Sequence, residues 1–322
     1  MALVRILFTV EANYAGWRLD RYLREKIRRL SRERVQHLIL HRLESGDGRR
    51  LKPSTRVQAG LRFALLKEAE PEPDTPMEFG VVLDDGALLV VDKPAGLPVH
   101  ATARYSVHTF TALARARFPE HKVDPAHRID RETSGLLVCG LFPEVTRILK
   151  RDFARGRVAK TYLAMALGAP PEDRFTVEAP LALTGASMVR VRMHAHPEGL
   201  ASLTEFEVLD RRCAPDGAPV ALLACRPRTG RQHQIRAHLH CAGLHMVGDK
   251  IYGPDETIFD RFTKGEMTEA DRSALRLPRH ALHAWRLELP HPLTRAPLSL
   301  EAPLPADLRG FWAGCTAPGV GR

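Results

Sequence analysis

The sequence has few cysteines and none of the long apolar runs that a membrane protein needs. No stretch of about 18 consecutive apolar residues occurs, so we predict no transmembrane helix and no membrane partner. Residues 1–10 become polar too quickly for a secretory signal. We therefore expect a protein that acts in the cytoplasm.

The five cysteines are widely spaced, and no Cys-x-x-Cys pair occurs among them. This pattern argues against a disulfide framework and against a zinc ribbon, and it is typical of reduced thiols. The cysteines are Cys139, Cys213, Cys225, Cys241 and Cys315.

Several motifs of cofactor and hydrolase chemistry are also missing. No glycine-rich phosphate loop occurs, and Ser134 lacks the Gly-x-Ser-x-Gly context of a hydrolase nucleophile. The histidines between residues 233 and 245 show no i, i+4 pair, and no acidic residue lies close to them. We predict neither a metal nor a cofactor.

The chain does have an excess of positive charge, and it is unevenly distributed. The net charge of the 322 residues is +10. Residues 1–70 hold 16 Lys or Arg and 8 Asp or Glu, so +8 of the total lies in this first fifth. Such a footprint indicates a nucleic-acid partner, although solubility alone could also explain a basic protein.

Two short basic helices are expected in this segment. The first carries one apolar face, formed by Leu19, Tyr22, Leu23, Ile27 and Leu30. Ser31 is a candidate N-cap for the second, whose apolar stripe is Val35, Leu38 and Ile39. A turn follows at 45–48, and 56–63 is typical of a turn and a strand. A solvated basic helical pair remains the alternative to RNA binding.

An acidic, proline-rich segment at 68–77 marks the predicted domain boundary. We expect a small domain over 1–67, a large domain over 78–316, and a disordered tail at 317–322.

Alternating apolar patterns predict the elements of the large domain. Strands are expected at 81–83, 87–91, 135–141, 158–164 and 280–287, with short strands and turns over 176–226. Helices are expected at 106–117 with Ser106 as cap, at 144–155, and after a cap at Thr229; 254–278 is expected to be a surface helical excursion.

The candidate site is the loop that precedes the apolar run Gly135–Leu141. Asp130 is the only carboxylate in 127–130, and Arg128 and Arg131 flank it. Nearby cations favour the charged form of a carboxylate. The alternative is that Asp130 caps a turn while its arginines face solvent.

Residues 127–137, HRIDRETSGLL, resemble the signature HRLDxxTSGLL of the RluA-type RNA pseudouridine synthases, with Ile129 for Leu as the one departure. Residues 229–239, TGRQHQIRAHL, match a second family signature, and 248–253 and 88–96 continue the resemblance. Lys160 and Tyr162 match the Lys-x-Tyr element of the family, although Tyr162 alone would be an ordinary half-buried strand aromatic.

This resemblance implies a catalytic role for Asp130, Tyr162 and Arg231. Asp130 would be the essential carboxylate, Tyr162 would lie against the target base, and Arg231 would pair with Asp130. Substrate contacts in the large domain would come from His127, Arg128, Lys160, Gln234 and Arg236.

The basic segment is similar to the alpha-L RNA-binding module of ribosomal proteins, with 41–50 replacing its usual glycine-rich turn. Its expected RNA contacts are Arg18, Arg21, Arg32 and Arg34. The implied fold is α+β, in which a mixed, mostly antiparallel sheet follows this small module.

The expected function is pseudouridine formation in large-subunit (23S-type) ribosomal RNA by a monomer without cofactor or metal. A tRNA-directed synthase, a non-catalytic ribosome assembly factor and a metal-dependent RNA hydrolase are the alternatives. Whether Asp130 attacks the ribose or removes a sugar proton stays open.

Overall fold

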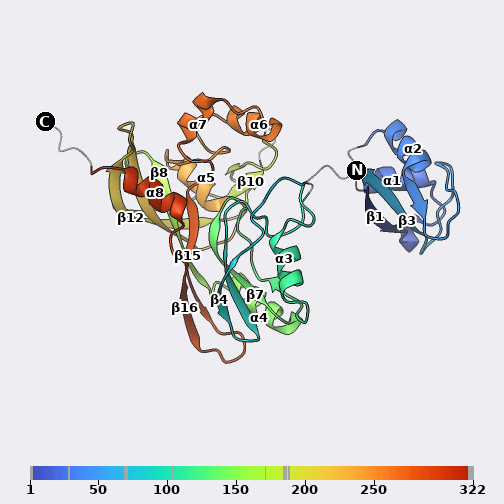
Figure 1. Cartoon of the computed structure of the whole chain (residues 1–322), viewed down its shortest axis with the longest axis horizontal. Helices are drawn as coiled ribbons and strands as arrows, with labels where there is room; N and C mark the ends of the chain where they lie inside the picture. Colours follow the sequence, from blue (N-terminus) through green and yellow to red (C-terminus); the bar gives the residue numbers. More distant parts are fainter. Residues whose placement is uncertain are drawn as a thin grey trace. The chain divides into compact units, whose positions relative to one another are not determined.

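The chain forms two compact units, Met1–Glu72 and Pro73–Arg322 (Figure 1). The structure is a computed structural model that describes residues 3–27, 30–68, 72–102, 104–170, 172–183, 187 and 189–317. The division between the units falls inside the acidic, proline-rich segment. Of the predicted tail, residues 318–322 lie outside the described residues.

The N-terminal unit is a small antiparallel sheet with two short helices. Its strand order is β1-β3-β2, and the 3-10 helix η1 follows β1. The elements are β1 (Leu3–Thr9), η1 (Ala12–Tyr14), α1 (Leu19–Lys26), α2 (Arg32–His41), β2 (Leu43–Ser45) and β3 (Arg62–Glu68).

The apolar faces of α1 and α2 build the core of this unit, as their spacing predicts. Leu19, Tyr22 and Leu23 of α1 are buried, and Val35 and Ile39 of α2 pack in the same cluster. The side chain of Ser31 accepts a hydrogen bond from the backbone N–H of Arg34 at 3.3 Å, which confirms the predicted N-cap of α2.

The second unit is organised around a mixed sheet of 11 strands. Its main path is β4-β5-β7-β15-β8-β13-β12-β9, with β6, β14 and β16 paired to β7, β8 and β15. The strands are β4 (Gly80–Asp84), β5 (Leu88–Lys93), β6 (Asp124–Pro125), β7 (Ser134–Gly140), β8 (Ala159–Leu167), β9 (Arg174–Glu178), β12 (Leu203–Cys213), β13 (Pro219–Pro227), β14 (His245–Met246), β15 (Leu282–Pro290) and β16 (Pro297–Glu301).

Six helices and one hairpin accompany this sheet in the described part of the unit. They are α3 (Phe110–Arg117), α4 (Pro143–Ala154), α5 (Gln234–Cys241), α6 (Thr257–Lys264), α7 (Glu269–Leu275), α8 (Ala306–Gly314), and the hairpin β10 (Leu181–Leu183) with β11 (Met193–Ala195). None of the described helices is long and apolar enough to cross a membrane.

The strand pairing agrees with the expected α+β class and the mostly antiparallel sheet. Among the described residues the pairing of β7 with β15 is parallel, and every other strand pairing is antiparallel. Figure 1 shows α4 close to β7 and α6 and α7 near α5. The last two helices are the predicted surface excursion.

Strand β7 is buried along its whole length, which explains the apolar run in the sequence. Leu137 and Cys139 pack in one core with Phe110, while Leu136 and Val138 pack in another with Leu149 of α4. Because apolar side chains cover both faces, the strand is a rigid support for the loop before it.

Three boundaries differ from the sequence-based predictions. Helix α3 begins at Phe110, because the side chain of Thr109 rather than Ser106 caps it by accepting the N–H of Ala112 at 3.2 Å. Helix α5 begins at Gln234 and not next to Thr229. The segment 176–226 ends in two long strands, β12 of 11 residues and β13 of 9, rather than in short ones.

Gly135, at the start of β7, is a position where only glycine fits. Its φ of 105° is unfavourable for other residues, and a Cβ there would lie 2.8 Å from the carbonyl carbon of Ala284 and closer still to its oxygen. We expect Gly135→Ala to lower the free energy of unfolding by about 2–5 kcal/mol, through backbone strain and overpacking.

Urea denaturation measures this effect, and Gly156→Ala is the matched control. Gly156 also has a positive φ, 68°, but a Cβ there meets open space. The Gly156→Ala substitution should lower the free energy of unfolding by only about 1–2 kcal/mol. Equal losses in the two variants would show that the close approach of β15 to Gly135 does not matter.

Candidate active site

The loop that carries Asp130 is held by an internal turn and by two histidines, His280 just before β15 and His283 within it. The backbone N–H of Thr133 donates to the Asp130 carbonyl at 3.1 Å and closes a turn. Thr133 Oγ1 lies 2.8 Å from His280 Nε2, and Ser134 Oγ lies 3.0 Å from His283 Nδ1. All four side chains are buried, so the end of the loop is fixed to the sheet.

The same loop is held from the other side by a buried lysine at the end of β5. Lys93 Nζ donates to the carbonyl oxygens of Pro94, Leu97 and Arg131 at 2.7, 2.9 and 3.1 Å. Burial lowers the pKa of Lys93 to about 7. Since one of its acceptors is the carbonyl of Arg131, the residue after Asp130, Lys93 restrains this loop through its backbone.

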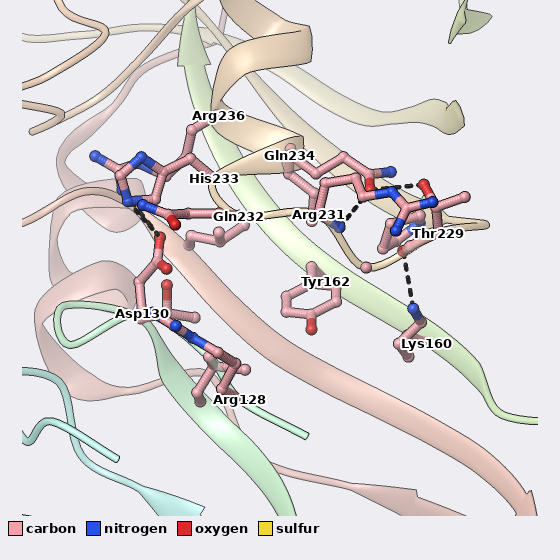
Figure 2. A pocket seen from close by; sticks show the side chains of 16 residues that line it. Arg128, Asp130, Lys160, Tyr162, Thr229, Arg231, Gln232, His233, Gln234 and Arg236 are labelled. Atoms are coloured by element: carbon pink, nitrogen blue, oxygen red, sulfur yellow. Dashed lines mark hydrogen bonds and ion pairs between the residues drawn. The ribbon is translucent and has the colours of Figure 1, made fainter. Parts of the chain in front are cut away.

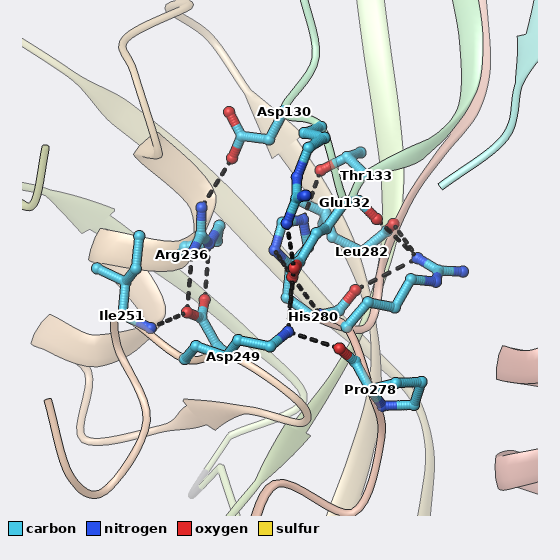
Figure 3. Close-up of polar contacts among 12 residues, drawn as sticks. Asp130, Glu132, Thr133, Arg236, Asp249, Ile251, Pro278, His280 and Leu282 are labelled. Carbon is cyan, nitrogen blue, oxygen red and sulfur yellow. Dashed lines mark hydrogen bonds and ion pairs between the residues drawn. The ribbon is translucent and has the colours of Figure 1, made fainter. Parts of the chain in front are cut away.

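Arg236 joins two carboxylates, as Figure 3 shows. Its Nε and Nη2 donate to Asp249 Oδ2 and Oδ1 at 2.7 and 2.8 Å, and its Nη1 donates to Asp130 Oδ2 at 2.9 Å. The side chain of Asp249 is fully buried and also accepts the N–H groups of Ile251 and Tyr252 at 2.9 and 3.0 Å. Arg236 is thereby fixed with one donor aimed at Asp130.

This arrangement keeps Asp130 ionised although the carboxylate is largely shielded from water. Burial raises the pKa of Asp130, but His233, Arg236 and His280 together lower it to about 2. Burial also lowers the pKa of His233 to about 4 and that of His280 to about 3, so both are neutral near pH 7. The cation that faces Asp130 at neutral pH is therefore Arg236.

Asp130 opens into a cavity of about 230 Å³ that Tyr162 also lines. Figure 2 shows Tyr162 between the Asp130–Arg236 pair and the contact of Lys160 with Thr229. Lys160 Nζ donates to the Thr229 carbonyl at 3.0 Å. Burial raises the pKa of Tyr162, so its hydroxyl stays protonated. Asp130, Tyr162 and Arg231, to which the resemblance gives a catalytic role, thus line one cavity, and the expected substrate contact Lys160 lines it too.

The prediction that Arg231 pairs with Asp130 is wrong in this structure, because Arg236 occupies that position. Arg231 lines the same cavity, but its Nε donates to the carbonyl of Ala201 at 3.1 Å. It lies on the loop before α5, whereas Arg236 lies in the first turn of α5. The later start of the helix therefore decides which arginine reaches the carboxylate.

Gln234 has interior partners instead of the expected exposure to RNA. Its side-chain oxygen accepts from Thr229 Oγ1 and from the backbone N–H of Arg231 at 2.7 and 3.0 Å. Its amide nitrogen donates to the Leu203 carbonyl and to Thr204 Oγ1, both at 3.0 Å. Gln234 is buried and holds the loop 229–231 against β12.

His127 and Arg128 differ in their freedom to contact a ligand. His127 Nε2 accepts the N–H of Val138 at 3.0 Å, and its ring stacks on Phe153 at a centroid distance of 4.5 Å. Burial lowers the pKa of His127 to about 3, so it is neutral. Arg128 lines the cavity of Asp130 and also an adjoining groove, which shares Lys160 and Tyr162 with that cavity. Arg128 therefore lies in the position expected of a substrate contact.

Two arginines of the N-terminal unit, Arg18 and Arg32, lie close to a buried acid, Asp20. Arg18 donates to Asp20 through Nε and Nη2 at 3.0 and 2.8 Å, and Arg32 Nη2 lies 3.9 Å from Asp20. The hydrogen bond from Arg18 lowers the pKa of Asp20 to about 2 against the opposing effect of burial. Arg21 lies over the ring of Trp17 at 4.0 Å.

The side chains of Arg21, Arg32 and Arg34 are exposed. Arg18, Arg21 and Arg32 line one surface hollow, whereas Arg34 is outside it. Three of the four predicted RNA contacts therefore lie together.

Sequence reasoning missed the parts played by Lys93, His233, Asp249 and Tyr252. Asp249 and Tyr252 lie in the segment 248–253, whose resemblance to the family was visible in the sequence. That resemblance did not assign a role to either residue. Among the residues that the structure describes, no group of three or more His, Cys, Asp or Glu is placed to hold a metal ion.

The family model for RNA pseudouridylate synthase matches residues 87–241. The chain is 34% identical over 312 residues to the ribosomal large subunit pseudouridine synthase D of Nitrosomonas europaea, which covers 94% of this chain and 86% of the relative. It is 30% identical over 318 residues to ribosomal large subunit pseudouridine synthase C of Escherichia coli, with 94% of each chain covered.

Solved structures give the same result. The structure of human RNA pseudouridylate synthase domain containing 1 has a TM-score of 0.59 and 26% sequence identity, covering 76% of this chain and 91% of the human chain. The fold, the cavity around Asp130 and the relatives agree, and the chain belongs to the RNA pseudouridylate synthase family.

Proposed function

We propose that this protein isomerises specific uridines of large-subunit (23S-type) ribosomal RNA to pseudouridine, with Asp130 as the essential carboxylate. The observation that carries the proposal is the half-buried, ionised Asp130 that Arg236 holds at the wall of a cavity lined by Tyr162. Ribosomal RNA as substrate is supported by the names of the relatives, which are ribosomal large subunit synthases.

The reaction breaks the bond between uracil N1 and ribose C1′, turns the base, and joins C1′ to uracil C5. The proton lost from C5 balances the proton gained at N1, so the conversion is an isomerisation without net oxidation or reduction. An ionised carboxylate next to the ribose can serve either as the nucleophile at C1′ or as the base that removes a sugar proton. Asp130 suits both roles, because its lowered pKa keeps it charged at neutral pH.

The target uridine has to leave its stack before it can enter the cavity. Unstacking costs a few kcal/mol, and stacking on an aromatic ring returns about 1–3 kcal/mol per base. Tyr162 is the aromatic side chain beside Asp130, and its raised pKa keeps it neutral against the base. Arg128 stands at the edge that the cavity shares with the adjoining groove, where it can contact the RNA strand or fill the vacated space.

The N-terminal unit, as an alpha-L-type module, would supply affinity for the RNA backbone. Arg21 and Arg32 are exposed and line the hollow beside Trp17, while Arg18 is neutralised by Asp20. Phosphate contacts of this kind add affinity without reading sequence. We propose that the protein works as a monomer in the cytoplasm, where its substrate is made.

The alternatives are distinguishable from the enzyme. A non-catalytic assembly factor on the same scaffold would bind ribosomal RNA and leave every uridine unchanged, and a tRNA-directed synthase would modify tRNA instead. The complete set of Asp130, Arg236 and Tyr162 in one cavity favours the enzyme. Pseudouridine mapping in total RNA, with and without the protein, identifies the substrate.

Removal of the Asp130 carboxylate tests the catalytic claim. We expect Asp130→Asn to abolish tritium release from RNA labelled at uracil C5 while RNA binding persists, because the amide neither attacks nor accepts the proton. Asp173→Asn is the control, since Asp173 is a surface acid with 81% of its side chain exposed. A fully active Asp130→Asn protein would contradict the proposed function.

The different contacts of Arg236 and Arg231 predict that Arg236 matters more for the reaction rate. We expect Arg236→Lys to lower the single-turnover rate by roughly 10²-fold, because lysine keeps the charge but lacks the planar fork that serves Asp249 and Asp130 together. Arg231→Lys should cost less than about tenfold, since Arg231 bonds to the carbonyl of Ala201. Thermal unfolding of both variants checks that they fold. The opposite ranking would restore the sequence-based assignment to Arg231.

A further inference from the structure

His233 occupies a strained position at the wall of the cavity. Its φ is 54°, in the left-handed region, and it is the N-cap residue of α5. Such a conformation costs of order 1–3 kcal/mol in a residue other than glycine and occurs mainly at functional sites. Its side chain lines the cavity next to Asp130, while only 10% of it is exposed.

The hydrogen bonds around Tyr252 determine which nitrogen of His233 carries the proton. Tyr252 Oη accepts the backbone N–H of Met193 at 2.8 Å and lies 3.2 Å from His233 Nδ1. Tyr252 is buried, so its hydroxyl hydrogen needs an acceptor. Among the described residues that acceptor is His233 Nδ1, and a neutral imidazole that accepts at Nδ1 carries its proton at Nε2.

His233 Nε2 therefore presents a donor to the cavity, facing the acceptor oxygens of Asp130. The distance from Nε2 to Asp130 Oδ2 is 3.9 Å, too long for a direct hydrogen bond. A single oxygen atom can bridge this gap by forming one hydrogen bond with Nε2 and one with Oδ2. If both bonds have ordinary lengths of about 2.7–2.9 Å, the angle between them at the oxygen is roughly a right angle. That oxygen must accept from His233 and donate to Asp130.

A ribonucleotide within an RNA strand offers one sugar oxygen with both properties. The 2′-hydroxyl donates and accepts, whereas the ring oxygen O4′, the esterified 3′ oxygen and uracil O2 only accept. An acceptor-only oxygen would satisfy His233 but would be repelled by the carboxylate. The 2′-hydroxyl also lies next to C1′ and C2′, the carbons at which Asp130 would act.

We propose that His233 Nε2–H and the Asp130 carboxylate together bind the 2′-hydroxyl of the target uridine, so that this site selects ribonucleotides. The proposal rests on the proposed function and deepens it by naming the group on the sugar that is recognised. Tyr252 is the positioning residue, because it fixes the tautomer of His233.

The test uses an RNA oligonucleotide that spans the mapped target uridine and a second one with 2′-deoxyuridine at that single position. The affinities of the full-length protein for both are measured by fluorescence anisotropy. Turnover does not disturb the measurement, since pseudouridine keeps the 2′-hydroxyl. Wild type should bind the ribonucleotide about tenfold more tightly, the size of one good hydrogen bond.

His233→Asn is the informative variant, because asparagine tolerates the left-handed backbone and is too short to reach the sugar. Its preference for the ribonucleotide should fall below about twofold, His233→Gln should recover part of it, and Tyr252→Phe should give an intermediate value. His196→Asn, at an exposed histidine of the same unit, and a 2′-deoxy substitution at the neighbouring nucleotide should leave the preference unchanged.

Two results would overturn the inference while the proposed function stands. One is an active wild type without a preference at the target sugar, and the other is an unchanged preference in a folded His233→Asn protein. A wild type that binds both oligonucleotides but forms no pseudouridine would contradict the proposed function, and the inference with it.

Discussion

The site depends on one guanidinium that is shared by two carboxylates, the buried Asp249 and the half-buried Asp130. Arg236 gives two of its donors to Asp249 and one to Asp130. The two carboxylates and the one guanidinium together carry a net negative charge in a region that is poorly accessible to water. Desolvating this charge is costly unless the carboxylates also accept hydrogen bonds. The backbone N–H groups of Ile251 and Tyr252 supply them at Asp249, so the geometry of Arg236 is set before any substrate arrives.

The sheet delivers Asp130 to this guanidinium with little freedom. β7 is buried on both faces, and Gly135 lets β15 approach. The side chains of Thr133 and Ser134 bond to His280, just before β15, and to His283 within it. Lys93 holds the loop from the side of β5. The loop that carries Asp130 is therefore held on two sides, and such rigidity is what the electrostatic preorganisation of a charged site requires.

Much of this architecture could be predicted from the sequence. The run Gly135–Leu141 indicated the buried strand, the apolar faces indicated α1 and α2, and the signature around Asp130 indicated the family. These features depend on neighbours in the sequence, or on residue types that rarely coincide by chance. The two compact units fall on either side of the composition change at 68–77.

The choice between Arg231 and Arg236 could not be predicted, because it depends on contacts between distant segments. Gln234 forms a hydrogen bond with β12, and His233 lies within hydrogen-bond distance of Tyr252. These two contacts hold the start of α5, and the position of that start determines which arginine faces Asp130. The tautomer of His233 depends likewise on Met193 in the hairpin β10–β11. Local spacing contains no information about such partners.

The most direct test of the account is the titration of Asp130 itself, followed through its carboxyl carbon by NMR. We expect no titration of this carboxyl between pH 7 and about pH 4, because its pKa is lowered to about 2. In Arg236→Gln the midpoint should move upward, since burial then acts without its counter-charge. A wild-type midpoint above about 4, the ordinary range of an aspartate, would contradict the claim that Arg236 holds Asp130 ionised.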